Sequence, residues 1–247
     1  MTRFPYRLTD PSRAAVLGLV VLKVDETIEE DFRAAFPGRE VALHISRVAS
    51  GDDLTPDTIA EMERCLPEAA SLLPPAATFD VVGYGCTSGT ALIGAEEVAR
   101  LVGGPTGARA VTDPLTAALE ALAALGIGRI GIVSPYIPSV STPIIRAFEA
   151  GGIEVAQALS FGEEVEARVA RIDPASTAEA ARQVARQTDI GAVFLSCTNL
   201  RTFGIIDALE EDLGLPVLSS NQVLAWHMAR LAGLETPGLP GRLGRMG

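Results

Sequence analysis

Residues 79–88 read FDVVGYGCTS, and residues 190–199 read IGAVFLSCTN. Each stretch is a short apolar run that ends in Cys-Thr and is followed by a segment with the apolar spacing of a helix. Apolar runs of this length, bounded by small or polar residues, are typical of buried strands in parallel sheets. The two stretches therefore predict two similar strand-to-helix units, one in each half of the chain.

The same alternation of strands and Ala-rich helices continues on both sides of these stretches. We expect strands at residues 15–22, 41–48, 81–85, 129–134, 153–159, 192–196 and 216–219. We expect helices near residues 26–36, 56–73, 90–101, 114–125, 143–150, 177–187, 203–213 and 221–232. This pattern indicates an α/β fold in which helices cover both faces of parallel sheets.

The internal repeat predicts two α/β lobes related by a pseudo-twofold axis. Open parallel sheets bind ligands at the carboxyl ends of their strands, so the two Cys-Thr motifs should face each other across a cleft. We place the first lobe at residues 14–112, with a C-terminal helix at 220–234 packing back on it, and the second lobe at 113–219. Residues 235–247 are rich in Gly, Pro and Arg and are expected to form a flexible tail.

Composition excludes several classes of function. The chain has 31 acidic and 20 basic residues, a net charge of -11, and no Lys/Arg cluster that would attract nucleic acid or an anionic membrane. Neither a secretory signal nor a membrane-spanning run is apparent, so we expect a cytoplasmic protein. Three cysteines without CxxC or His-rich spacing indicate free thiols rather than disulfides or a zinc site.

Two of the three cysteines have a setting that favours chemistry. Cys86 and Cys197 are each expected where a strand ends and a helix begins, and a helix N-terminus stabilises a thiolate. The backbone N–H groups there can also hold a substrate carboxylate without Lys or Arg. Hydroxyl and amide groups next to the cysteines add donors for the same purpose, namely Thr87, Ser88, Thr198 and Asn199.

Two thiols on opposite faces of a bound carbon suit racemisation, in which one removes a proton and the other delivers one. If the substrate has an activated double bond, one thiolate can instead add to it and allow cis-trans isomerisation. Most buried cysteines are simply small core residues, and we interpret Cys65 in this way. His44 and His227 are interpreted as packed residues, because two distant histidines do not make a metal site.

Four segments resemble the aspartate/glutamate racemase superfamily, especially its maleate isomerase and arylmalonate decarboxylase branch. They are GYGCTSGT at 83–90, SPY at 134–136, FLSCTNLRT at 194–202 and LSSNQ at 218–222. The resemblance spans about residues 14–234 and implies two flavodoxin-like lobes with the active site between them, and no metal or organic cofactor. It implies that Cys86 is the nucleophile or base and Cys197 the acid/base. Thr87, Ser88 and Tyr136 then match positions that bind a substrate carboxylate.

The differences from this branch concern the substrate. Asp25 and Glu166 stand where maleate isomerases carry two substrate-binding asparagines. A carboxylate repels a substrate carboxylate and attracts an ammonium or amide nitrogen. Asp25 has an alternative role as the N-cap of the helix that follows it. The run LKVDETIE at 22–29 also resembles a subgroup found in ectoine utilisation.

These observations lead to one favoured function and two alternatives. The favoured function is a cofactor-independent racemase or epimerase of an amino acid or N-acyl diamino acid. Within this function, the resemblance to the ectoine-utilisation subgroup indicates a substrate from ectoine catabolism. The alternatives are a maleate-type cis-trans isomerase and a non-catalytic, two-lobed binding protein. Arylmalonate decarboxylases lack the first-lobe cysteine, which argues against decarboxylation. The apolar, Ala-rich helices favour a homo-oligomer.

Overall fold

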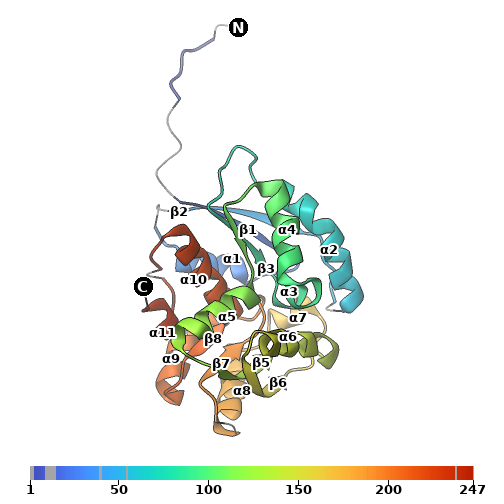
Figure 1. The fold of residues 1–247 in the computed structure, drawn as a ribbon, viewed down its shortest axis with the longest axis vertical. Helices are drawn as coiled ribbons and strands as arrows, with labels where there is room; N and C mark the ends of the chain where they lie inside the picture. Colours follow the sequence, from blue (N-terminus) through green and yellow to red (C-terminus); the bar gives the residue numbers. More distant parts are fainter. Residues whose placement is uncertain are drawn as a thin grey trace.

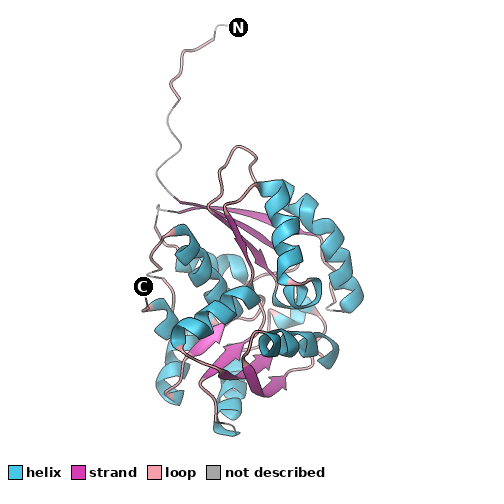
Figure 2. Ribbon diagram, viewed as in Figure 1, coloured by secondary structure: helices cyan, strands magenta, loops and turns pink. Residues whose placement is uncertain are grey.

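A computed structural model of the chain describes residues 3–8, 15–38, 41–53, 55–187, 189–236 and 238–246. The described residues contain two four-stranded sheets in which all paired strands are parallel, with helices packed around both sheets (Figures 1 and 2). The predicted α/β fold with two parallel-sheet lobes is therefore confirmed. Ala14, the predicted start of the first lobe, and Gly247, the end of the predicted tail, lie outside the described residues.

The first sheet has the strand order β2-β1-β3-β4. In its centre, β1 and β3 are buried because their residues are almost all apolar or glycine, as both faces of a covered parallel sheet require. Val21 of β1 pairs with Gly85 of β3, so the loops after these two strands leave the same edge of the sheet. That edge therefore carries both Asp25 and Cys86. The bounds are β1 Ala15–Leu22, β2 Val41–Val48, β3 Val81–Gly85 and β4 Ala110–Thr112.

The second sheet has the strand order β6-β5-β7-β8, the same arrangement as the first. Leu195 of β7 pairs with Val133 on one side and Ser219 on the other. The residues after β5, β7 and β8 consequently meet at one edge, which brings Tyr136, Cys197 and Ser220 into one region. The bounds are β5 Arg129–Ser134, β6 Glu154–Ser160, β7 Ala192–Leu195 and β8 Val217–Ser219.

Helices cover both sheets, and α3 and α7 lie between them in Figure 1. Among the described residues, no helix is both long and apolar enough to cross a membrane. The bounds are α1 Ile28–Ala35, α2 Pro56–Ser71, α3 Thr87–Ile93, α4 Ala95–Thr106, α5 Pro114–Leu125, α6 Pro138–Ala150, α7 Glu166–Val169, α8 Pro174–Gln187, α9 Phe203–Leu213, α10 Ser220–Ala232 and α11 Gly241–Gly244.

Two elements of the first lobe differ from the sequence expectation. The single helix expected at 90–101 is two helices, α3 and α4, which meet at Gly94 with φ 93, a value that favours glycine. The helix also begins at Thr87, directly after Cys86, rather than at Thr90. The structure adds β4 as an eighth described strand, which three residues, Ala-Val-Thr, are too few to reveal by periodicity.

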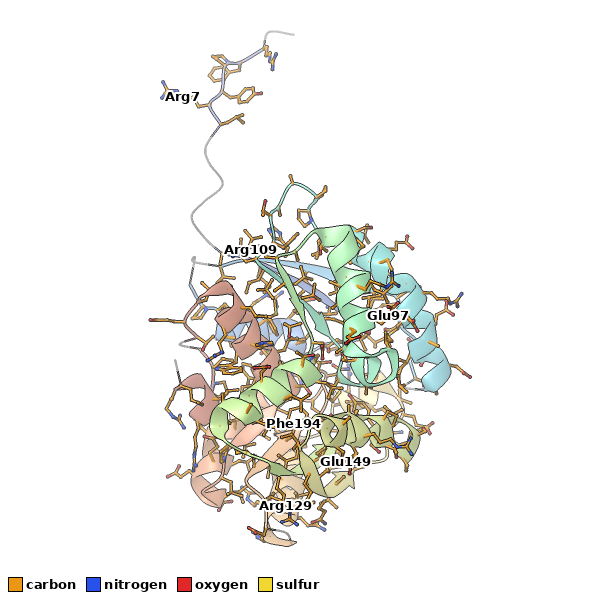
Figure 3. The ribbon with its side chains drawn as sticks, in the orientation of Figure 1. Arg7, Glu97, Arg109, Arg129, Glu149 and Phe194 are labelled. Atoms are coloured by element: carbon orange, nitrogen blue, oxygen red, sulfur yellow. The ribbon has the colours of Figure 1, made fainter. Side chains whose placement is uncertain are left out.

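The core joins the two lobes into one body. One hydrophobic cluster contains Leu19 of β1, Phe194 of β7 and Trp226 of α10, so it extends from one sheet to the other. Phe194, labelled in Figure 3, is fully buried and packs edge-on against Phe148 with 5.1 Å between ring centroids. Helix α10 packs against α5, α1 and β3, and so connects the end of the chain to the first lobe.

The tail is more ordered than the sequence suggests. Leu239 and Leu243 are buried, and α11 packs against α9 and β8. Glu210 accepts hydrogen bonds from the backbone N–H groups of Arg242 and Val217, at 2.7 and 3.0 Å. The expectation of a flexible tail at 235–247 is corrected for residues 238–246, because two leucines supply apolar contacts that the Gly/Pro/Arg composition conceals.

Candidate active site

Cys86 is the N-cap residue of α3, as the sequence predicts. Its sulfur accepts a hydrogen bond from the Gly89 N–H at 3.1 Å and lies 3.6 Å from the Ser88 hydroxyl oxygen. The side chain is 2% exposed. Burial raises the pKa of the Cys86 thiol to about 11, while the Ser88 hydroxyl and the Gly89 N–H lower it. The thiol is therefore neutral at pH 7 in this buried setting, with donors in place to hold a thiolate.

Cys197 has a different backbone setting from the one expected. The next helix, α9, begins at Phe203, so Cys197 does not stand at a helix N-terminus and the expected dipole effect is wrong for this residue. Among the residues that the structure describes, Cys197 is the one non-glycine with a positive φ, 153. Such a conformation costs on the order of 1–3 kcal/mol and is concentrated at functional sites. The Asn199 N–H donates to the Cys197 sulfur at 3.3 Å, and burial raises the pKa of this thiol well above its ordinary value.

The two Cys-Thr motifs lie against each other across the lobes. The Thr87 hydroxyl donates to the Ser220 hydroxyl oxygen at 2.8 Å, and the Cys197 N–H donates to the same oxygen at 3.1 Å. The Thr198 hydroxyl donates to the Gly85 carbonyl at 3.3 Å. The repeated motifs thus meet as the pseudo-twofold arrangement predicts, with Ser220 of α10 as the link between them.

Tyr136 lies with the cysteines. It follows β5, is 2% exposed, and has its backbone carbonyl held by the Ser160 hydroxyl. The pKa of its phenol is raised well above the ordinary value, first by burial and then by the neighbouring Cys197, Cys86 and Glu166. In return, the phenol O–H lowers the pKa of Cys197 by hydrogen bonding. Tyr136 is therefore a donor that faces the same space as both thiols.

Asn199 holds the loops of both lobes together rather than facing open space. Its side-chain N–H groups donate to the carboxylate of Glu166 at 2.7 Å and to the Glu166 carbonyl at 3.3 Å. Its side-chain oxygen accepts from the Glu26 N–H at 2.9 Å, and its backbone carbonyl accepts from the Thr27 hydroxyl at 3.1 Å. Asn199 consequently fixes Glu166 and the loop after β1, and its amide hydrogens are engaged by the protein.

Glu166 is a buried carboxyl within the site, 3% exposed. Burial raises its pKa to about 7; the Asn199 hydrogen bond lowers it, and the Asp25 carboxylate raises it. The charge of Glu166 also raises the pKa values of Cys86 and Cys197. A surface cavity of about 240 Å³ borders Glu166 and is lined by Lys23, Val24, Glu26, Asp52, Val165, Glu166 and Ala167.

Asp25 stabilises the start of α1 from a position two residues before the N-cap, which is Thr27, so the expected N-cap role is corrected to a neighbouring one. Its Oδ1 accepts from the backbone N–H groups of Thr27 and Ile28, both at 2.8 Å, and so caps the start of α1. Its Oδ2 is buried and makes no hydrogen bond within the described residues, since the nearby Thr198 hydroxyl donates its single proton to Gly85. Burial raises the pKa of Asp25. The free oxygen is the part of the side chain that a ligand can use.

Arg47 of β2 fixes the loop that carries Asp25. One guanidinium nitrogen, Nη1, donates to the carbonyls of Leu22, Lys23 and Asp25 at 3.1, 3.0 and 3.0 Å. The other, Nη2, is paired with Glu29 of α1. Arginine can serve several acceptors at once because its donors are arranged in a rigid fork. The sequence gives Arg47 no role, because its partners lie 18 to 25 residues away along the chain.

Asn221 and Asp31 form a buried hydrogen-bonded pair near the site that the sequence did not predict. Asn221 donates to the Asp31 carboxylate and to the Thr198 carbonyl, both at 2.7 Å. Burial raises the pKa of Asp31 to about 7, Asn221 lowers it, and Asp25 raises it. The segment LSSNQ at 218–222 carried the resemblance that points to this region, but it did not assign Ser220 or Asn221 a partner.

The remaining candidates behave as packed residues. His44 contacts Phe79 edge-on, and His227 Nδ1 lies 2.8 Å from the Thr112 hydroxyl oxygen. Cys65 is half-buried in α2 and packs against a hydrophobic cluster. Within the described ranges, no three His, Cys, Asp or Glu side chains are grouped so that they could hold a metal ion. The side chains gathered at the two motif cysteines carry thiol, hydroxyl, carboxyl and amide groups.

The sequence of this chain is similar to those of known proteins. The sequence matches the arylmalonate decarboxylase family over residues 96–243. A maleate isomerase of Nocardia farcinica is 27% identical over 241 residues, which cover 87% of this chain and 88% of that protein. An arylmalonate decarboxylase of Bordetella bronchiseptica is 31% identical over 131 residues, which cover 53% of this chain and 55% of that protein.

A solved structure extends the likeness to the fold. It is the Nocardia farcinica maleate cis-trans isomerase, in a Cys-to-Ser mutant with a covalently bound succinylcysteine intermediate, and it is 25% identical to this chain. The TM-score is 0.80, with 95% of this chain and 99% of that chain covered. Because the family match spans more than half of the sequence, the chain belongs to the arylmalonate decarboxylase family, within the Asp/Glu racemase superfamily that also contains the maleate isomerases.

Proposed function

We propose that this chain is a cofactor-independent, two-cysteine racemase or epimerase of an amino acid or N-acyl amino acid. The observation that carries the proposal is the free, buried Oδ2 of Asp25 in a site that contains both thiols and Glu166. An unpaired buried carboxylate is costly unless a ligand supplies a partner. A substrate ammonium or amide N–H supplies that partner, whereas a second carboxylate would be repelled.

Racemisation follows from two acid/base groups on opposite sides of one carbon. The step starts from the form in which the Cys86 thiol has given its proton to water. This thiolate takes the Cα proton, and the electron pair of the broken C–H bond moves into the substrate carboxylate as an enediolate. The Cys197 thiol then gives its proton to the opposite face of the same carbon. After this step Cys86 is a thiol and Cys197 is a thiolate, which is the form that catalyses the reverse direction. Proton exchange with water restores the first form.

The donors around the thiols support this chemistry. The developing negative charge on the substrate carboxylate needs hydrogen bonds, and the Ser88 and Tyr136 hydroxyls are buried beside the thiols. The hydroxyl protons of Thr87 and Thr198 are engaged by Ser220 and Gly85, so these two residues hold the motifs in place. Burial makes such donors stronger than they are in water. The site thus requires neither Lys nor Arg to hold an anion, in keeping with the acidic composition of the chain.

The substrate class follows from the acidic groups. Burial and then the Asp25 carboxylate raise the pKa of Glu166, so the two carboxyl groups repel each other and a cation between them would relieve that repulsion. Amino acids with a second nitrogen, free or acylated, are therefore the first substrates to test. Diaminobutyrate derivatives of the kind formed in ectoine catabolism belong to this class.

A maleate-type cis-trans isomerase is the second candidate. The succinylcysteine in the Nocardia farcinica structure supports a covalent route in that protein. Here the Cys86 thiolate would add to the double bond, the electron pair would move into a carboxylate, and rotation would precede expulsion of the thiolate. Decarboxylation, the activity that names the family, is disfavoured by a first-lobe cysteine where arylmalonate decarboxylases have none.

The deciding experiment is incubation with amino acids, N-acyl diamino acids and maleate in deuterated water, followed by NMR and polarimetry. Racemisation incorporates deuterium at Cα and lowers optical rotation, while cis-trans isomerisation yields a trans alkene. Rapid turnover of maleate with no Cα exchange in any amino acid would reverse the order of the two candidates.

Single Cys86→Ser and Cys197→Ser variants test whether the chain is a catalyst at all. Loss of general acid/base chemistry should lower turnover roughly a thousandfold in each, with Cys65→Ser as the matched control that retains activity. A non-catalytic binding protein would instead keep its ligand affinity in both variants and show no turnover in the natural chain.

A further inference from the structure

Tyr84 is a buried tyrosine that the proposed function leaves without a role. It lies in β3 two residues before Cys86, so the two side chains project from the same face of the strand. Both belong to the same hydrophobic cluster, and Tyr84 is fully buried. A tyrosine placed there extends its phenol toward the carboxyl end of the strand, where the sulfur lies.

The phenol oxygen and the Cys86 sulfur border one glycine. A Cβ added to Gly89 would lie 2.5 Å from the Tyr84 hydroxyl and 2.9 Å from the Cys86 sulfur. The Gly89 N–H already donates to that sulfur at 3.1 Å. The absence of a side chain at position 89 thus leaves the room in which the phenol and the thiol approach each other.

The Tyr84 hydroxyl is an orphaned donor in this structure. It is buried, and among the described residues it makes no hydrogen bond. A neutral thiol is a poor acceptor, whereas a thiolate is a strong one, so an unpaired O–H beside a sulfur gains a partner when the sulfur ionises. Burial is the largest influence on the pKa values of both groups and raises them; beside it, the phenol lowers the pKa of Cys86 and the sulfur further raises the pKa of Tyr84.

We propose that Tyr84 is a positioning residue whose hydroxyl donates to the Cys86 sulfur when the thiol has lost its proton, and so stabilises and aims that thiolate. This inference rests on the proposed role of Cys86 as the base or nucleophile. It gives the two cysteines matching environments, because Cys197 has the Tyr136 phenol and the Asn199 N–H where Cys86 has the Tyr84 phenol and the Gly89 N–H.

The test is the variant Tyr84→Phe, which keeps the ring in the core and removes only the hydroxyl. We expect the pH midpoint for alkylation of Cys86 by iodoacetamide, followed by peptide mass spectrometry, to move upward by about one pH unit. The substrate kcat should fall roughly tenfold near neutral pH with little change in KM. Tyr6→Phe, at a residue that is 68% exposed, is the matched control and should change neither value.

Gly89→Ala provides an independent second variant, because its methyl group would force the phenol or the sulfur to move. It should shift the alkylation midpoint of Cys86 in the same direction as Tyr84→Phe. An unchanged Cys86 midpoint in folded Tyr84→Phe overturns the inference. Alkylation needs no substrate, so a shifted midpoint in an enzyme that racemises nothing would reject the proposed function and leave the role of Tyr84 standing.

Discussion

Thr87 and Ser220 join the two lobes through a hydrogen bond of 2.8 Å between their hydroxyl oxygens. The two residues are 133 positions apart, and both are almost fully buried. The Ser220 oxygen also accepts the Cys197 N–H at 3.1 Å. One hydroxyl therefore links the residue next to the first-lobe cysteine with the backbone of the second-lobe cysteine, and the relative placement of the two thiols depends on it.

Ser220→Ala should disturb stability and turnover together. It leaves the Thr87 hydroxyl and the Cys197 N–H without their acceptor, and a buried unpaired polar group costs about 1–3 kcal/mol. We expect the free energy of unfolding to fall by about 2 kcal/mol in urea titrations and kcat to fall at least tenfold. Ser139→Ala, at an exposed position of α6, is the control. Wild-type kcat in Ser220→Ala would contradict the link.

The separation in sequence between contacting residues explains which features of the fold and the site could be predicted from the sequence. Apolar strands and the repeated Cys-Thr motif are local signals, so the sheets and both cysteines were predicted from them. The contacts of Ser220 and Asn221 join residues far apart in sequence, and no local pattern reports them. The orphaned hydroxyl of Tyr84 was hidden for another reason, because an aromatic residue in a strand is expected simply to pack.

The backbone at Cys197 could not be predicted from its motif. Its motif matches that of Cys86, and from the sequence both were expected at helix starts, yet α9 begins only at Phe203. Cys197 has a positive φ, and residues 198 and 199 form a turn directly after it. Backbone strain of this kind is maintained by surrounding contacts, which a single sequence does not display.

Glu166 should make stability depend on pH. Its pKa is raised to about 7 in the folded chain from an ordinary value of 4.5, first of all by burial. Between these pH values the folded chain binds more protons than the unfolded chain, so the free energy of unfolding falls as pH rises from 4.5 to 7. The loss from this group is on the order of 3 kcal/mol. Asp31, whose pKa is also raised to about 7, adds a slope of the same sign.

Urea titrations at several pH values between 5 and 8 measure this slope. In Glu166→Gln the side chain cannot ionise and can still accept the Asn199 hydrogen bond, so the decline with pH should be shallower. Glu164→Gln changes an exposed neighbour and should retain the wild-type slope. Equal slopes in Glu166→Gln and the wild type would show that Glu166 ionises normally.

Arg47 should control substrate binding through the loop that carries Asp25. Arg47→Met removes the donors to the carbonyls of Leu22, Lys23 and Asp25 while keeping an apolar stem. We expect KM to rise roughly tenfold, a loss of about 1.4 kcal/mol of binding, with a smaller effect on kcat. Arg33→Met is the matched control, since Arg33 also pairs with Glu29 but contacts none of those carbonyls. Equal effects of the two variants would assign the result to Glu29 instead.

Asp25→Asn should exchange one substrate class for another. The asparagine oxygen can still accept from Thr27 and Ile28, so the start of α1 is preserved, while an amide NH₂ takes the place of the free Oδ2. An N–H donor repels a substrate ammonium and binds a carboxylate. Amino-acid turnover, measured as kcat/KM, should therefore fall roughly a hundredfold, and affinity for maleate, measured by calorimetry, should rise. Glu26→Gln, which alters the adjacent exposed carboxylate paired with Arg171, should do neither. Retention of amino-acid turnover by Asp25→Asn would remove the carboxylate from substrate recognition and leave it as a helix cap alone.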